Sequence, residues 1–300
     1  MTAVHTFTLN TGAKIPAIGF GTWKSPPGEV AAAVEAAFDA GYRHFDCAPL
    51  YYNEAEIGEV FKRTKVPRSE YFVTTKLVTV ALDKSLSDLC LDYVDLYLMH
   101  WPVTLDPTTD EKYGKENRKI HSTGWDFKDT WREMEALLST GKVRAIGVAN
   151  FSTVNLEKLL QTAKVVPAVN QTEIQPLLPQ DRLHAFCQAK GIHQTAFGPL
   201  GGAASGKTLH QLSAIKDIAE KRGTGTGNVM LSWGVQKGWS VIPKSVNPVR
   251  IKQNLNGNVV LSEEEMARID ELARPKGKRF NKPDWGTVIF HDDAQVDLED

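Results

Sequence analysis

The chain has 300 residues, of which 42% are hydrophobic and 24% are charged, and its 35 Lys and Arg nearly balance 36 Asp and Glu. A formal net charge of -1 gives no general attraction for nucleic-acid phosphates or anionic membranes, so we expect neither as a partner. No stretch approaches the roughly 18 apolar residues of a membrane span. The first ten residues lack the basic and apolar regions of a secretory signal, so we expect a cytoplasmic location. The three cysteines follow no metal-binding spacing, and we expect free thiols and no metal site.

The N-terminal segment predicts a small β-hairpin, because the apolar residues of 7–9 and 14–18 flank the turn residues Asn10 to Gly12. From residue 17 onward, short β-rich runs alternate with helical runs. The predicted strands cover residues 17–21, 44–48, 71–76, 93–101, 144–150, 168–173, 192–198 and 239–245. The helices predicted to follow them cover 29–40, 53–64, 82–91, 127–139, 152–163, 179–190, 208–222 and 247–254.

This alternation predicts the fold class. Gly41, Gly141 and Gly191 each follow a helical run directly, where a left-handed cap residue is expected. Apolar strands separated by helices indicate a parallel sheet covered on both faces, and eight such units indicate a closed α/β barrel, the (β/α)8 or TIM barrel. No linker composition interrupts the pattern, so we expect a single domain over 1–300. The segment 103–124 and the tail after residue 273 lie outside the repeats, and we expect the tail to form a loop over the active site.

Polar residues lie where most of these strands end, which is where the active site of such a barrel forms. They are Asp46, Lys76, His100, Asn150, Gln171, Glu173, Lys244 and Ser245. Each alone is more often a capping or structural residue than a catalyst. Together with Tyr51, just beyond the second strand, three of them form a plausible acid and base set. A buried Asp46 would keep Lys76 charged, and a charged Lys76 beside Tyr51 would lower the pKa of the phenol. Tyr51 would then act as a general acid near neutral pH.

Several segments resemble the aldo-keto reductases in order and spacing across nearly the whole chain. They are GYRHFDCAPLYYNE (41–54), TTK (74–76), LMHWP (98–102), GVANF (147–151), VNQ (169–171) and IPKSVNPVRIKQN (242–254). The tail RFNKPDWGTVIFHDD (279–293) also resembles fungal members that reduce sugars, glyceraldehyde and other aldehydes. The resemblance implies a monomer that reduces aldehydes or ketones reversibly to alcohols with NADPH. Tyr51 would deliver the proton, Lys76 and Asp46 would tune Tyr51, and His100 would orient the carbonyl.

The resemblance also implies how NADPH or NADP+ is held. Asn150 and Gln171 would bind the carboxamide, with Asp46 close by, and Phe197 would stack on the nicotinamide. The further cofactor residues that it implies are Gly21, Thr22, Trp23, Gly198, Leu200, Lys244, Ser245, Val246, Arg250, Gln253 and Asn254. Trp23 and Trp101 would line an aromatic substrate pocket beside Tyr51 and His100. Independently of any family, an Arg beside a Lys makes a good phosphate clamp, which favours NADPH over NADH. The alternative interpretation is that these basic residues bind no phosphate and are only the solvent-exposed first turn of a helix.

The sequence departs from the family pattern at several positions. Ala149, Phe197 and Gly198 stand where Ser, Tyr and Ser are usual, which removes a side-chain hydrogen bond to the cofactor worth roughly 0.5 to 1.5 kcal/mol. Gln253 stands in place of Glu. Only residues 77–82 separate Lys76 from Asp83 of the next helix, where the family has a longer loop. A displaced lysine would leave a barrel that binds the cofactor as a sensor or subunit, which is the alternative function.

A second alternative comes from GGAASGKT (201–208), which fits the phosphate-loop pattern G-x-x-x-x-G-K-[ST]. An NTPase also needs a strand that runs straight into the first glycine and a later strand that ends in Asp. Pro199 interrupts the first, and the only later strand ends in Lys and Ser. In a reductase this segment would be a loop over the cofactor pyrophosphate, with glycines permitting close backbone approach.

Overall fold

The computed structural model describes residues 5–26, 28–77, 82–104, 124–274, 277–285 and 287–292, apart from the side chains of 203–207. It opens with an antiparallel hairpin of β1 (Thr6–Thr8) and β2 (Lys14–Pro16). Leu9 and Ile15 of this hairpin pack against Leu96 and Val169, at the amino ends of barrel strands. The predicted hairpin is therefore confirmed, and it covers the end of the barrel opposite the strand carboxyl ends.

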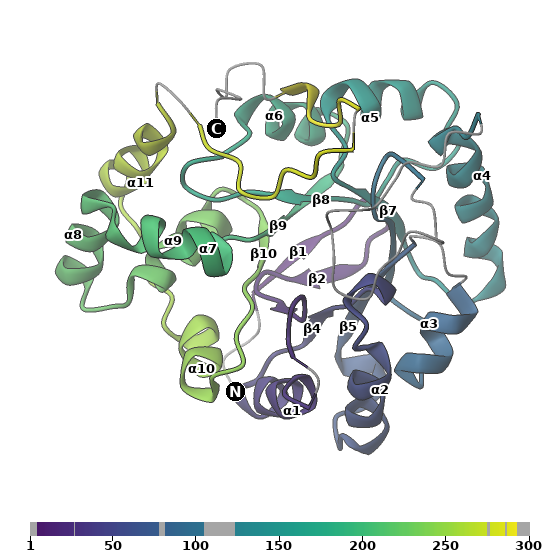
Figure 1. Ribbon diagram of the computed structural model, residues 1–300, viewed down its shortest axis with the longest axis horizontal. Coiled ribbons are helices and arrows are strands. Elements are labelled where there is room, and N and C mark those ends of the chain that lie inside the picture. Colours follow the sequence, from purple (N-terminus) through teal and green to yellow (C-terminus); the bar gives the residue numbers. More distant parts are fainter. Residues whose placement is uncertain are drawn as a thin grey trace.

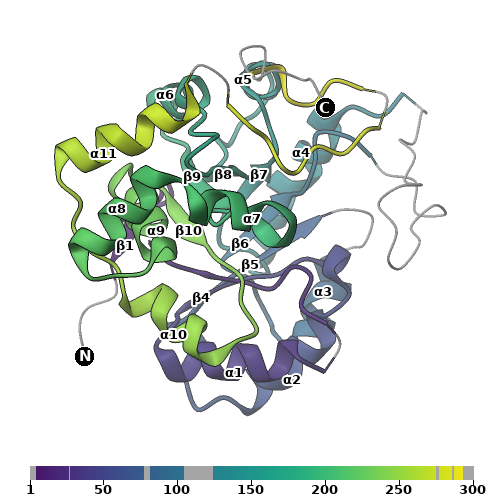
Figure 2. The same cartoon turned by 60° about the vertical axis from the view of Figure 1, so that its left-hand side comes forward.

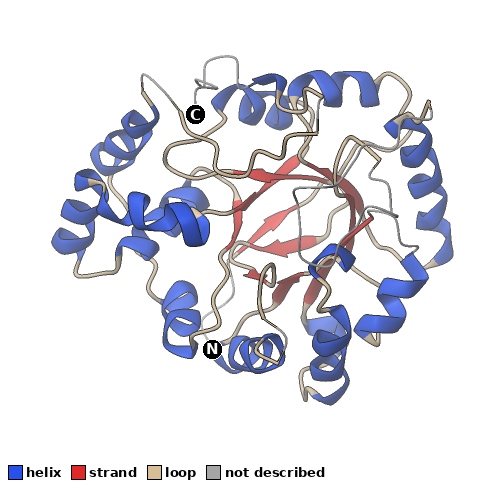
Figure 3. Cartoon of the chain, in the orientation of Figure 1, coloured by secondary structure: helices blue, strands red, loops and turns tan. Residues whose placement is uncertain are grey.

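Within the described residues, eight parallel strands pair in chain order around a barrel (Figures 1 and 3). They are β3 (Phe20–Gly21), β4 (His44–Asp46), β5 (Phe72–Leu77), β6 (Leu96–Met99), β7 (Ile146–Ala149), β8 (Val169–Glu173), β9 (His193–Phe197) and β10 (Ser240–Ile242). Backbone hydrogen bonds close the ring, because Gly19 N donates to Val241 O and Val241 N donates to Ala17 O, both at 2.8 Å. Gly19 is needed there, since a Cβ atom would lie 2.5 Å from the ring of His44. The predicted (β/α)8 barrel is confirmed.

Helices surround the strands (Figure 3). They are α1 (Val30–Ala40), α2 (Glu54–Arg63), α3 (Leu82–Leu89), α4 (Phe127–Leu137), α5 (Thr153–Leu160), α6 (Asp181–Ala189), α7 (Gly202–Gln211), α8 (Ser213–Arg222), α9 (Thr226–Gln236), α10 (Pro248–Asn256) and α11 (Glu263–Asp270). Short 3-10 turns lie at Pro49–Tyr51 (η1), Arg68–Glu70 (η2), Leu138–Thr140 (η4) and Glu271–Ala273 (η5). Each amphipathic helix buries its apolar stripe on the barrel, as α1 does with Val34 and Phe38. The three predicted cap glycines all have positive φ.

The prediction fails around 201–236. The single helix expected at 208–222 is two helices, because Leu212 is extended and separates α7 from α8. α9 was not predicted, since its residues 228–234 are buried on every side and give no amphipathic period. α11, which begins at a capping box of Ser262 and Glu265, was also missed. Figure 2 shows α7, α8, α9 and α11 grouped on one side of the barrel.

The segment 201–208 is helical from Gly202 onward, where a loop over the cofactor pyrophosphate was expected. Gly201 has φ 79° and caps α7, which starts at Gly202. A phosphate loop presents N–H groups of a non-helical loop to the phosphate before its helix begins, whereas here the second glycine of the motif, Gly206, already lies inside the helix. The loop conformation expected here is therefore wrong, and the phosphate-loop alternative gains no support. Ala203 and Ala204, which are strong helix formers, explain why the helix starts so early.

The described part of the tail crosses the carboxyl ends of β7 and β8 and reaches α5 (Figure 1). Glu173, at the end of β8, accepts hydrogen bonds from Phe280 N at 2.8 Å and Asn281 N at 2.7 Å. Further along, the Asp292 carboxylate accepts a hydrogen bond from Thr153 N at 2.7 Å, at the start of α5. The described part of the tail is thus held at residues 280–281 and again at Asp292, across the face where the site was predicted. In the part of the chain that the structure describes, no helix is long and apolar enough to cross a membrane.

Candidate active site

The centre of the site is a buried ion pair between neighbouring strands. Asp46 ends β4 and Lys76 lies in β5, and both side chains are almost fully excluded from water. Lys76 Nζ donates to both carboxylate oxygens of Asp46 at 2.8 Å and to the Cys47 carbonyl at 3.0 Å. Gln171 Nε2 donates to the same carboxylate at 2.7 Å. The short connection from Lys76 to α3 therefore leaves the lysine in place, although residues 78–81 of that connection lie outside the described part.

Tyr51 lies directly above this pair, at the end of η1. Lys76 Nζ is 3.1 Å from Tyr51 Oη, within hydrogen-bond distance, and 4.9 Å from the centre of its ring. Burial of the phenol, followed by the negative charge of Asp46, raises the pKa of Tyr51 well above 10. The net shift is therefore upward, which is opposite to the lowered pKa that was predicted from the contact with Lys76. The ammonium and the carboxylate form a neutral pair, which cannot offset the loss of water around the phenol.

His100 and Trp101 follow β6 and form the next wall of the site. The His100 ring lies 6.0 Å from the Tyr51 ring, centre to centre, at 80°. Trp101 stacks beside His100, and Trp285 of the tail meets Trp101 edge-on at 4.9 Å. The predicted imidazole thus lies beside the predicted phenol. Trp285 is a wall residue that the sequence analysis did not name, although it expected the tail to cover the site.

Asn150 and Gln171 offer acceptor atoms on the same side. Asn150 follows β7 with φ 63°, and its Nδ2 donates to the His100 carbonyl at 2.9 Å. Its Oδ1 is buried with no hydrogen-bond partner among the described residues. Because Gln171 uses its amide N–H₂ on Asp46, its carbonyl oxygen remains as the acceptor. The unpartnered Asn150 Oδ1 and the carbonyl oxygen of Gln171 fit the amide N–H₂ of a nicotinamide carboxamide, which needs acceptors.

The cations expected at the 2'-phosphate lie beyond β10 at the start of α10. Lys244 and Arg250 are both exposed, and neither forms an ion pair with a carboxylate among the described residues. Packing around the ammonium and the charge of Arg250 lower the pKa of Lys244, whereas Glu29 raises it, so the two cations are near one another. Lys244 Nζ donates to the Lys24 carbonyl at 3.1 Å. A pair of unneutralised cations at this point fits a phosphate group.

The remaining predicted cofactor residues fall into two groups around these cations. Ser245, before α10, and Asn254, within α10, are buried, whereas Gln253 is exposed and Val246 is half-buried. Phe197 and Gly198 lie at the end of β9, and a Cβ on Gly227 would lie 3.8 Å from Leu200 and 3.9 Å from Asn254. The structure therefore brings the ends of β9 and α10 together around one edge of the mouth.

The loop after β3 connects the two ends of the site. Thr22 Oγ1 donates to the Asp46 carbonyl at 2.8 Å, and Asn53 Nδ2 donates to the Thr22 carbonyl at 3.0 Å. A Cβ on Gly21 would lie 2.8 Å from the Ile242 carbonyl, so the close approach of β3 to β10 requires glycine. The ring of Trp23 lies 4.7 Å from the ammonium of Lys24. Asn53 was missed by the sequence analysis, because an Asn before a helix predicts only a cap.

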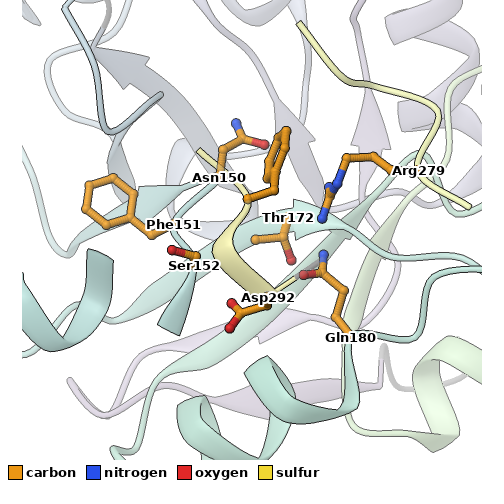
Figure 4. A pocket seen from close by; sticks show the side chains of 8 residues that line it. Asn150, Phe151, Ser152, Thr172, Gln180, Arg279 and Asp292 are labelled. Atoms are coloured by element: carbon orange, nitrogen blue, oxygen red, sulfur yellow. The ribbon is translucent and has the colours of Figure 1, made fainter. Parts of the chain in front are cut away.

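Two hollows lie beside these residues. A small cavity lies between the ends of β7 and β8 and the tail, where the labelled Arg279, Gln180 and Asp292 surround Thr172 (Figure 4). A larger, open one lies between the segment after β6, the start of α4 and the tail. It is lined by Pro102, Val103, Thr104, Gly124, Trp125, Asp126, Phe127, Lys128, Lys158, Trp285 and Thr287. Since Trp285 also touches Trp101, this larger hollow is adjacent to the predicted catalytic residues.

Comparison with known proteins gives consistent matches. Residues 17–274 match the family model described as the aldo/keto reductase family. The chain is 47% identical to a glycerol 2-dehydrogenase (NADP(+)) and 45% identical to the aldehyde reductase YPR1, both from Saccharomyces cerevisiae. These matches cover 93% and 94% of this chain, and 94% and 95% of the relatives. A crystal structure of an aldo-keto reductase complexed with NADPH is 33% identical, with a TM-score of 0.84 over 94% of this chain and 91% of that one.

Proposed function

This chain belongs to the aldo/keto reductase family, and we propose that its site reduces small aldehydes and ketones to alcohols with Tyr51 as the proton donor. It is an NADP(H)-dependent oxidoreductase, and the reaction is reversible. The observation that carries the residue assignment is the contact of one ammonium, that of Lys76, with both Asp46 and the Tyr51 phenol.

NADPH supplies the hydride when it is bound. The chain's own residues bind and orient the reactants and move the proton. The acceptor oxygens of Asn150 and Gln171 would hold the carboxamide of the cofactor. Lys244 and Arg250 bind the phosphate of the adenosine end.

The substrate carbonyl oxygen lies between Tyr51 Oη and the His100 ring. His100 orients it, and Tyr51 donates its proton as negative charge develops on that oxygen. The raised pKa of Tyr51 keeps the phenol protonated at neutral pH, which is the form that reduction needs. Lys76 stabilises the phenolate that remains, and Asp46 holds Lys76 in position. Alcohol oxidation needs the phenolate instead, so its rate should rise with pH where that of reduction does not.

The test measures NADPH consumption by the purified protein with glyceraldehyde, xylose and a nitrobenzaldehyde, beside NADH. Tyr51→Phe should lower turnover by roughly 10² to 10⁴ and leave NADPH binding, followed by tryptophan fluorescence, unchanged. Tyr52→Phe is the matched control, because Tyr52 is the next residue and is exposed. Full turnover by Tyr51→Phe would refute the proton-donor role.

The two alternatives predict different results. A barrel that only binds the cofactor would show fluorescence quenching by NADPH and no turnover of any aldehyde. That alternative required a displaced lysine, whereas Lys76 contacts both Asp46 and Tyr51 in the structure. An NTPase would hydrolyse nucleoside triphosphates with Mg²⁺, and the helical α7 argues against it. The cytoplasmic location, the monomeric state and the single domain over 1–300 stay predictions.

A further inference from the structure

Glu54 is a buried carboxyl group to which the proposed mechanism gives no role. It is the first residue of α2, three positions after Tyr51, and only 3% of it is exposed. An acid in the first turn of a helix is usually a solvated partner for the helix dipole. Here the side chain is instead turned into the protein, beside the strand that carries Lys76.

The partners of Glu54 lie on the elements packed around it. Thr75 Oγ1, on β5, donates to Glu54 Oε1 at 2.5 Å, and the next residue of that strand is Lys76. Glu54 Oε2 is buried and has no hydrogen-bond partner among the described residues. The other titratable or charged groups that interact with this carboxyl are Cys47 after β4, Tyr51 in η1, Lys76 in β5, Tyr97 in β6, and Asp88 of α3.

This environment is poorly suited to a permanent negative charge. The pKa of Glu54 is raised to about 7, mainly by burial and to a smaller extent by the negative charge of Asp88. The hydrogen bond from Thr75, the Ser85 hydroxyl group nearby, which is too far away or misaligned for a hydrogen bond, and the charge of Lys76 lower the pKa but do not compensate. Glu54 therefore changes its charge in the neutral range, within the low-dielectric surroundings of the phenol. The negative form of Glu54 in turn raises the pKa of Tyr51.

We propose that Glu54 is a positioning residue that sets how readily Tyr51 gives up its proton. This inference rests on the proposed function. Through Thr75, Glu54 fixes the part of β5 that holds Lys76 under the phenol. Through its charge, it opposes the phenolate that Lys76 stabilises, because two negative charges in a buried cluster repel each other. Tyr51 is thus a better acid when Glu54 is neutral than when Glu54 is ionised.

The rate of aldehyde reduction should therefore decrease as pH rises through about 7, to a lower plateau rather than to zero. Suppose that ionised Glu54 raises the pKa of Tyr51 by one unit and that half of this change is expressed in the transition state. The rate of reduction then falls about threefold. The rate is measured in single turnovers of the enzyme mixed with NADPH and then with aldehyde, so that product release does not hide proton transfer. In Glu54→Gln the side chain keeps its size and its acceptor for Thr75 but cannot ionise, so the step should disappear.

Two further variants separate this role from a structural one. Thr75→Val removes the hydroxyl group that favours ionised Glu54, so the step should move to higher pH. Glu59→Gln is the matched control, because Glu59 lies on the same helix and is exposed. Its profile should equal that of the wild type. A purely structural Glu54 would give variants that change the rate equally at every pH.

Infrared difference spectra test the ionisation without turnover. The wild-type protein should lose a protonated carboxyl band as pH rises through about 7, and Glu54→Gln should lack that band. Turnover with the same pH profile in the wild type and in Glu54→Gln would overturn this inference alone. A wild type that binds NADPH but reduces no carbonyl compound would refute the proposed function, and this inference with it.

Discussion

The buried ion pair of Asp46 and Lys76 makes a strong prediction for Lys76→Met. Methionine fills a similar volume but removes the ammonium that contacts both oxygens of Asp46, the Cys47 carbonyl and Tyr51. The Asp46 side chain, only 3% exposed, then keeps Gln171 as its side-chain partner and carries an uncompensated charge. Breaking a buried pair in this way typically costs roughly 3 to 5 kcal/mol. We expect a loss of that order in the free energy of unfolding at pH 7.

Urea unfolding followed by tryptophan fluorescence measures this loss. The matched control is Lys84→Met, because the pair of Lys84 with Asp88 is at the surface and 61% of the lysine side chain is exposed. That control should lose at most about 0.5 kcal/mol. The double variant Asp46→Asn/Lys76→Met removes the stranded charge, so it should recover part of the stability but none of the activity. A loss below about 1 kcal/mol in Lys76→Met would refute the reasoning, because it would mean that the Asp46 charge is well solvated.

Two more predictions concern the cofactor and acid stability. Arg250→Ala should raise the Michaelis constant for NADPH about 10- to 100-fold and leave that for NADH unchanged, since a charge-assisted hydrogen bond contributes roughly 1.5 to 3 kcal/mol. Equal effects on both cofactors would contradict the 2'-phosphate assignment. His44 and His193 have pKa values that burial lowers to about 4. As pH falls from 6.5 towards 4, the unfolded chain therefore binds protons at these histidines that the folded chain does not bind. The free energy of unfolding should fall over this range by up to roughly 3 kcal/mol for each histidine. Because the raised pKa of Glu54 makes the folded protein more stable as pH falls, urea unfolding is measured on the Glu54→Gln variant. An unchanged free energy of unfolding between pH 6.5 and 4 would show that the two histidines are not held neutral in the folded protein.

The strand order of the barrel could be predicted because it depends on local pattern. Each buried strand is a short apolar run, and each helix that covers it has one apolar stripe and a cap such as Gly41. The pattern fails at α9, because burial on all sides removes the apolar stripe. It also fails at α7, where the segment that matches the phosphate-loop motif forms a helix. A motif specifies residues but does not specify the backbone conformation around them.

The site divides along the same line. By itself the sequence determined which residues meet at the mouth, because the carboxyl ends of parallel strands converge there: Asp46, Lys76 and His100 are chemical groups at strand ends, with Tyr51 just beyond. Only the tertiary structure decided the proton affinity of Tyr51, which burial raises although a lysine lies beside it. Only the tertiary structure turned Glu54 inward and placed Trp285 against Trp101. Solvent exclusion and contacts between distant segments depend on the whole packed chain. Strand order and the apolar faces of helices depend instead on the pattern of residues that are neighbours in the sequence.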